Sequence, residues 1–194
     1  MKKLILFAAF LPLLVSCGGR VVDPVQEAIK GEIMGNMSQE FTDVTINFVE
    51  KIDSTTFRQE FDRRRKVFIL KRDADSDLLL KYMTEGKKRN AAIKSDSYKQ
   101  DLLILQGLDS LEAAHSSILD DIAYYDFRFN ADAKGQGLKM QFRNAFISIT
   151  PDGRVISMTA ERRDLHKSAG RVIPGYIELV KGSDEEEGTD DVDL

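Results

Sequence analysis

The feature that most constrains the fold of this 194-residue chain is its single cysteine, at position 17. One cysteine cannot form a disulfide within the chain, so a hydrophobic core has to stabilise the fold. The segment from Cys17 to Leu194 is long enough for one domain, because a chain of this size buries roughly 70 % of its unfolded surface. The chain therefore needs no disulfide, and no residue after Cys17 offers a thiol for catalysis.

The cysteine follows a segment with the organisation of a secretory signal peptide. Lys2 and Lys3 form a positively charged start, and residues 4–15 form an apolar run that contains Pro12. As a helix, this run would extend about 18 Å, well short of the roughly 30 Å hydrocarbon core of a bilayer. Its length and its proline therefore favour a cleaved signal over a retained membrane span.

The tetrapeptide Leu14-Val15-Ser16-Cys17 resembles the lipobox of bacterial lipoproteins at all four positions. The resemblance implies cleavage between Ser16 and Cys17, a diacylglyceryl thioether on the cysteine sulfur, and acylation of the new amino terminus. Several acyl chains anchor a protein stably, whereas one chain does so only marginally. Gly18 stands where lipoproteins retained in the inner membrane carry Asp, which favours the outer membrane in a cell that has one. The alternative is a conventional signal with an incidental cysteine.

Charge is distributed unevenly along the chain. Residues 17–181 carry 26 basic and 25 acidic side chains, whereas residues 182–194 carry seven acidic and no basic ones. A balanced body argues against nucleic-acid binding, which needs a basic excess on one face. An acidic end of low hydrophobicity is typical of a disordered tail. We therefore divide the chain into a signal peptide (1–16), a lipidated tether (17–22), a single domain (23–181) and a disordered acidic tail (182–194).

The domain is predicted to begin with an amphipathic helix and a strand. Asp23 and Pro24 are typical of a helix start, and Gly35-Asn36 of a helix end. Between them, apolar residues recur at i, i+4 spacing and define one face (Val25, Ile29, Ile33, Met37). Alternation of apolar and polar residues then predicts a half-buried strand over residues 42–52.

Three charged helical stretches are predicted next, and we expect them to form a helical hairpin or one bent arm. The first starts at a cap in Asp53-Ser54 and places Phe57, Phe61 and Phe68 on one side. Residues 73–77 are expected to interrupt the helix before it resumes over residues 78–89, with Leu79 and Met83 inward. The third stretch runs over residues 97–121, with an apolar stripe along one side (Leu102, Leu105, Leu108, Leu111).

From Tyr124 the pattern changes to the alternation of strands, with an aromatic inner face at Tyr125, Phe127 and Phe129. The apolar phase of the following strand shifts by one residue, which predicts a β-bulge near Asn144. Thr150-Pro151-Asp152-Gly153 predicts a tight hairpin. A third strand follows over residues 154–158, and Arg171–Val180 is expected to add a short edge strand or to lie along the surface.

This order predicts an α+β fold in which a three-stranded meander completes an antiparallel sheet packed on helices. A helix lying across such a sheet is similar to cystatin-like and NTF2-like folds. The run from Asp23 through Ile52-Asp53-Ser54 to the FISITPDGRVISM hairpin (146–158) also resembles a recurring group of short bacterial cell-envelope lipoproteins. That resemblance implies location and fold but no activity.

The candidate chemical motifs are weak. The acidic run at 73–77 has the first half of a calcium-loop spacing, but Leu78 stands at the glycine position and Thr84 at the glutamate position. Residues 63–66 are basic but point around a whole helical turn, which indicates a solvated helix with local ion pairs. His115 and His166 are the only histidines, and neither has a second ligand at metal spacing. We therefore predict no metal, no cofactor and no catalytic residue.

These observations favour a lipid-anchored cell-envelope protein that acts as a binding, inhibitory or assembly module and not as an enzyme. Its envelope partner and oligomeric state stay open. A second hypothesis is a ligand carrier or enzyme with a cleft between helix and sheet, for which Asp126 and Glu161 are the candidate buried carboxylates. A third is a fimbrial or adhesive subunit, with Arg171–Val180 as the candidate strand for pairing.

Overall fold

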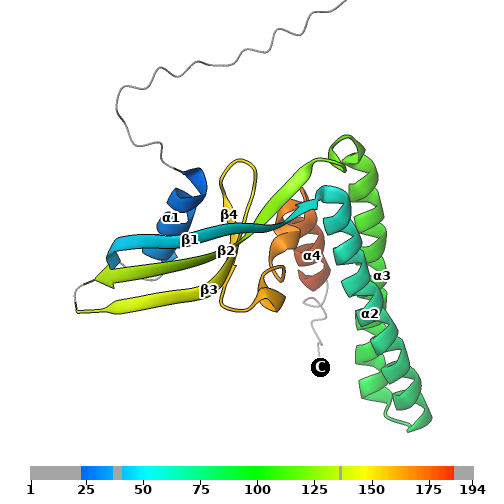
Figure 1. Ribbon diagram of the computed structural model, residues 1–194. Coiled ribbons are helices and arrows are strands. Elements are labelled where there is room, and N and C mark those ends of the chain that lie inside the picture. The colour runs from blue at the N-terminus through cyan, green and yellow to red at the C-terminus, as the bar shows by residue number, and fades with distance from the viewer. Residues whose placement is uncertain (1–22, 37–40, 136, 186–194) are drawn as a thin grey trace, which may run out of the picture.

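The fold is α+β, which confirms the predicted class (Figure 1). The computed structural model describes residues 23–36, 41–135 and 137–185. Within these residues, four α-helices accompany one antiparallel sheet of four strands in the order β1-β2-β3-β4. The elements in chain order are α1 (Pro24–Asn36), β1 (Phe41–Thr56), α2 (Phe57–Thr84), α3 (Lys88–Ala114), β2 (Ile122–Gly135), β3 (Lys139–Ile149), β4 (Val155–Thr159) and α4 (Tyr176–Glu185).

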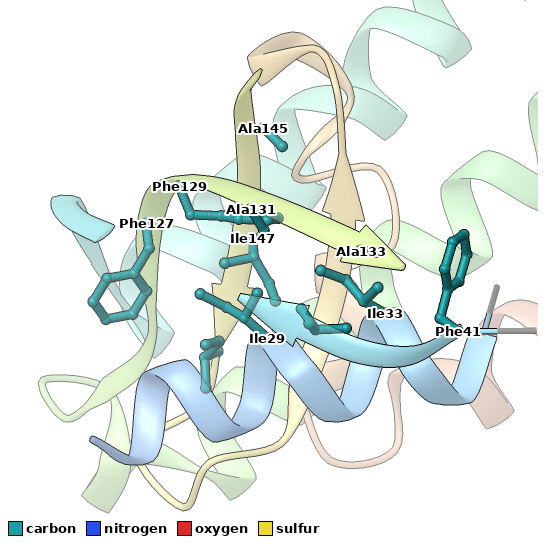
Figure 2. Packing of buried hydrophobic residues seen from close by; sticks show 11 residues of the cluster. Ile29, Ile33, Phe41, Phe127, Phe129, Ala131, Ala133, Ala145 and Ile147 are labelled. Carbon is teal, nitrogen blue, oxygen red and sulfur yellow. The ribbon is translucent and has the colours of Figure 1, made fainter. Parts of the chain in front are cut away.

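Helix α1 covers one face of the sheet and closes the main core (Figure 2). It starts as predicted, with the Val25 amide donating to Asp23 Oδ1 at 3.0 Å. Ile29 and Ile33 are fully buried, and they pack in one cluster with side chains of β2 and β3 (Phe127, Phe129, Ala131, Ala133, Ala145, Ile147). Burying one such isoleucine stabilises the fold by about 1.5–3 kcal/mol. The hydrophobic core therefore lies between α1 and this face of the sheet.

The β-bulge predicted near Asn144 is present. Phe129 of β2 pairs with Ala145 of β3, and Ala131 pairs with Phe142, so β3 has one more residue than β2 between these pairs. Asn144 takes φ of 52°, and its amide donates to Asn130 Oδ1 at 2.7 Å. The extra residue changes which side chains face α1, and this accounts for the shift in the apolar phase of the sequence. The predicted hairpin is also present: the Gly153 amide donates to the Thr150 carbonyl at 2.9 Å, and Gly153 has φ of 87°.

The predicted arm is a hairpin of two long helices, and the expected interruption at residues 73–77 is wrong. Helix α2 runs unbroken through this segment because Asp75 is buried against α3, where Lys94 Nζ lies 2.7 Å from Asp75 Oδ1 and Ser97 also donates to this carboxylate. The predicted cap at Asp53-Ser54 is wrong as well, since both residues belong to β1.

The true N-cap of α2 is Thr56, which forms a capping box with Gln59. Helix α3 begins at Lys88 and ends at Ala114, earlier than predicted at both ends. Met83, which was expected to face inward, is 65 % exposed. At the base of the hairpin, the amides of Phe57 and Arg58 donate to the carbonyls of Asp121 and Leu119, which ties the start of α2 to the segment after α3.

The C-terminal segment is helical, so of the two alternatives for Arg171–Val180, an edge strand or a segment along the surface, the edge strand is wrong. A 3-10 turn spans Ala169–Val172, and α4 follows. Tyr176, Leu179 and Val180 have helical spacing and pack on the cluster of α2 and α3 that contains Ile104 and Leu108. Residues 182–185, assigned to the disordered tail, belong to α4, whereas 186–194 lie outside the described residues, as do the signal peptide, the tether and Met37.

The hydrophobic clusters of the described residues are formed by side chains between Val25 and Val180. A chain that begins a few residues before Asp23 therefore contains every residue of these clusters. None of the described helices is both long and apolar enough to cross a membrane.

Candidate functional site

A groove lies where the start of α1 meets the hairpin between β3 and β4. Its volume is about 370 Å³. Its walls are mainly apolar, and they come from the first turn of α1, from β1 and β2, and from the β3–β4 turn (Pro24, Val25, Lys51, Tyr125, Phe127, Ile149, Thr150, Pro151, Asp152, Gly153). The groove therefore has the size and lining of a site for a small apolar group or an apolar side chain of a partner.

A second hollow, of about 510 Å³, shares Tyr125, Thr150, Pro151 and Asp152 with the first. Its other walls come from the base of α2, from the segment at the start of β2, from the β3–β4 turn and from the C-terminal segment (Phe57, Asp121, Ile122, Ala123, Arg154, Val172). Tyr125 and the β3–β4 turn thus stand between two depressions of the surface. We call the pair of hollows the Tyr125 groove.

Four charged residues line the Tyr125 groove (Lys51, Asp121, Asp152, Arg154), and two of them make contacts that fix their position. The Lys51 ammonium lies 4.0 Å from the centroid of the Tyr125 ring, which is a cation–π contact. Asp152 is held in the turn by hydrogen bonds from Thr150 and from Arg154 Nε, the latter at 2.8 Å. These two bonds hold the pKa of Asp152 below its usual value. Lys51 thus places a cation beside an aromatic ring of the groove, and Asp152 places a held anion in the turn.

A buried polar junction lies on the opposite face of the sheet from α1. Asp126 is 1 % exposed, and its Oδ2 lies 2.7 Å from Nε2 of His166 in the C-terminal segment. Its Oδ1 accepts a hydrogen bond from the Ser148 hydroxyl at 2.6 Å. Because Ser148 donates to the carboxylate and His166 contacts the other oxygen, the histidine is not placed to take the serine proton. The three residues are of the types found in hydrolases, but their arrangement is that of a structural link.

The junction continues into the base of α2 through Glu60. This carboxylate is fully buried and accepts hydrogen bonds from Arg64 Nε at 2.7 Å, from the Tyr124 hydroxyl at 2.7 Å and from Arg63 at 2.5 Å. Burial raises the pKa of Tyr124, and the neighbouring Glu60 charge raises it further. The buried arginine also donates to the carbonyls of His166 and Lys167, at 2.5 Å and 3.3 Å. Glu60 thus links the sheet, the α2–α3 hairpin and the C-terminal segment.

The structure brings only some of the sequence candidates together. Asp126 is the buried carboxylate that the second hypothesis requires, but it does not line the Tyr125 groove. Glu161 is exposed and pairs with Arg163. His166 contacts Asp126, whereas His115 lies at the C-terminal end of α3. Ser16 and Cys17 lie outside the described residues.

The solvated helix with local ion pairs that the sequence predicts for the basic run at 63–66 is only partly correct. Arg65 pairs with Asp62, Asp109 and Glu112, as a solvated pairing would. Arg64, in contrast, is 7 % exposed and belongs to the buried junction. The spacing in the sequence indicates the pairing of Glu60 with these arginines, because Glu60 precedes Arg63 and Arg64 by three and four residues, the spacing at which helical side chains meet.

The contacts within the two sites do not follow from the sequence, because the residues that form them come from distant segments. Glu60 and Tyr124 are 64 residues apart, and Asp126 and His166 are 40 residues apart. In the described part of the chain, no three His, Cys, Asp or Glu side chains converge in a way that would hold a metal ion. Comparisons of this chain with protein-family models, with curated proteins and with solved structures found no match.

Proposed function

We propose that this protein is a lipid-anchored component of a bacterial cell envelope that binds a partner without catalysing a reaction. The observation that carries the proposal is the tetrapeptide Leu14-Val15-Ser16-Cys17 behind a charged start and a short apolar run. Acyl chains on Cys17 would hold the domain at the membrane, and Gly18 favours the outer membrane. The partner of this anchor is the lipid bilayer, and nucleic acid is not expected as a ligand.

The Tyr125 groove is the proposed binding surface. Its apolar walls and its size fit an apolar side chain or short apolar segment of an envelope protein. Its position supports a role close to the anchor, since Pro24 and Val25 line it and the tether precedes them in the chain. A helix across an antiparallel sheet is also the arrangement of cystatin-like and NTF2-like folds, and we propose this as the finer fold type.

Lipidation is tested by labelling cells with a radioactive or clickable palmitate analogue. The unmodified protein should incorporate the label and sediment with membranes as the shortened form that begins at Cys17. The Cys17→Ala variant should incorporate no label and should keep its signal peptide. Equal membrane-bound processed protein in both strains would show that the cysteine is incidental.

Binding through the groove is tested by affinity capture from detergent-solubilised envelope. Pro151→Arg places a long charged side chain in the wall of the groove, at an exposed turn where the fold tolerates it. Glu161→Arg introduces the same side chain at another exposed position outside the groove, with the loss of the exposed ion pair to Arg163, and serves as the control. A partner that is captured by the unmodified protein and by Glu161→Arg, but not by Pro151→Arg, supports the proposal. Capture by all three proteins argues against the groove.

A small-ligand carrier is the second candidate function, and the Lys51 ammonium beside Tyr125 is the observation that favours it. An amphipathic anion would place its apolar part in the groove and its charge near Lys51. Native mass spectrometry of protein purified without detergent distinguishes the two, since a carrier should retain a bound small molecule that Pro151→Arg loses. The fimbrial hypothesis has lost its basis, because Arg171–Val180 is not a strand.

A further inference from the structure

The tip of the α2–α3 hairpin, residues 80–94, exposes apolar side chains to solvent. Leu80 and Met83 at the end of α2 are 62 % and 65 % exposed, and Ile93 in the second turn of α3 is 58 % exposed. Residues 83–90 are all exposed. Figure 1 shows the tip projecting away from the sheet and from α4. Such a group of large apolar side chains at the end of a projecting element is typical of an interaction surface.

The same tip is strongly basic. It carries five basic side chains (Lys81, Lys87, Lys88, Arg89, Lys94) and one acidic side chain, Glu85, a net charge of +4, whereas the rest of residues 23–181 carry a net charge of −4. Lys87 pairs with Glu85 at 2.7 Å, and Lys94 pairs with Asp75 at 2.7 Å. Among the described residues, no acidic side chain forms an ion pair with the other three. Their charge is therefore available to an anionic partner.

The exposed apolar side chains of the tip lie close to one another along the axis of the hairpin. With a rise of 1.5 Å per residue, Met83 lies about 5 Å from the turn at Gly86 along the helix axis, and Leu80 and Ile93 lie about 10 Å from it. Interfacial apolar side chains enter a bilayer by about 5–10 Å, while lysine and arginine remain at the phosphates. Because Lys87, Lys88 and Arg89 lie nearer the turn than the three apolar side chains, the tip fits a bilayer that it meets with its side, where the long basic stems reach the phosphates.

We propose that the hairpin tip is a second membrane contact, which docks on a bilayer of anionic phospholipid. The apolar side chains come from both helices, and the basic side chains of the tip lie beside them in the chain, so a bilayer with an apolar interior and anionic headgroups offers a partner for both kinds of group. The contact is separate from the anchor, because α1, which follows the tether, lies at the other end of the molecule (Figure 1). It extends the proposed function but does not depend on lipidation.

Vesicle sedimentation tests the proposal with a chain that begins at Arg20. This chain contains all the residues of the hydrophobic clusters but neither the signal peptide nor Cys17, so a failure of lipidation does not affect the result. Its folding is first checked by circular dichroism and by a cooperative urea transition. We expect binding to vesicles with about 30 % phosphatidylglycerol, little binding to pure phosphatidylcholine, and release as salt rises from about 0.1 M to 0.5 M.

Two variants test the two components of the surface. Lys88→Glu combined with Arg89→Glu should lower the partition constant at least about tenfold, since each basic group near an anionic surface changes it several-fold. Leu80→Ser combined with Met83→Ser should also lower it about tenfold. The matched control is Val67→Ser with Leu70→Ser, which removes exposed apolar side chains of α2 away from the tip and should leave binding unchanged.

Three outcomes would overturn the proposal. The first is equal binding to neutral and anionic vesicles, and the second is equal binding by the control and both tip variants. The third is capture of the chain by immobilised polyglutamate without binding to vesicles, which would assign the tip to an acidic protein. A tip label, made by attaching an environment-sensitive fluorophore to Thr84→Cys, gives an independent readout: it should shift to the blue with anionic vesicles, whereas the same label at Ser110→Cys should not.

Discussion

Removal of the Glu60 carboxylate should destabilise the protein far more than removal of an exposed carboxylate with similar geometry. Glu60 is fully buried and accepts from Arg64 at 2.7 Å, whereas Glu50 in β1 is half exposed and accepts from Arg128 at 2.6 Å. Glu60→Ala leaves the buried Arg64 charge without its carboxylate, a change that costs about 3–5 kcal/mol. We expect the lower end, because this arginine keeps two backbone carbonyl acceptors. Glu50→Ala should cost at most about 1 kcal/mol.

Equilibrium urea denaturation measures the difference. With a denaturant slope of about 2 kcal/mol per molar urea, a loss of about 3 kcal/mol lowers the midpoint by about 1.5 M, and the Glu50 control shifts it by at most about 0.5 M. Combining Glu60→Leu with Arg64→Met removes the buried pair together, so the double variant should be more stable than Glu60→Leu alone. Equal shifts for Glu60→Ala and Glu50→Ala, or strict additivity in the double variant, would refute the role assigned to the junction.

Two further predictions concern single residues. Burial alone would raise the pKa of Asp75, but hydrogen bonds from Lys94 and Ser97 and the nearby positive charge outweigh it, so the native pKa lies below the usual value. Asp75 therefore stabilises the fold above its unfolded pKa of about 4 and loses this effect as the pH falls further. The difference in unfolding free energy between the original protein and Asp75→Asn should narrow below about pH 4. Urea titrations between about pH 7 and pH 3 measure this difference. Asn144→Ala should lower the unfolding free energy by about 1 kcal/mol, because alanine tolerates φ of 52° poorly. Asn144→Gly removes the same side chain but accepts this φ, so in thermal unfolding the glycine variant should lie close to the original protein.

The sheet half of the fold was the more predictable one, because its signals are local. The shift in apolar phase at Asn144 and the Thr150–Gly153 turn each depend on a few adjacent residues, and both appear in the structure at the predicted positions. The start of α1 at Asp23 and Pro24 is similar, since a cap and a first-turn proline need no partner elsewhere.

The helical half and the sites depend on contacts between distant residues. The acidic segment 73–77 has the composition of a helix break. Lys94 and Ser97, 19 and 22 residues after Asp75, donate hydrogen bonds to the Asp75 carboxylate and allow α2 to continue. The segment Arg171–Val180 has few local signals, and its helix forms because Leu179 packs on α3 at Gly107. The Tyr125 groove is likewise made by segments from Pro24 to Val172, which no local pattern can bring together.

Strand β1 passes into helix α2 with no loop between them, so the hairpin and the strand move together. Thr56 is the last residue of the strand and the cap of the helix, and two backbone hydrogen bonds hold the base of α2 to the segment after α3. A helix of 28 residues is about 42 Å long, so a rotation of about 10° at this joint would move the tip by about 7 Å. A small rotation at the end of β1 would therefore move residues 80–94 by several ångströms, and a displacement of the tip would in turn rotate the backbone at Thr56.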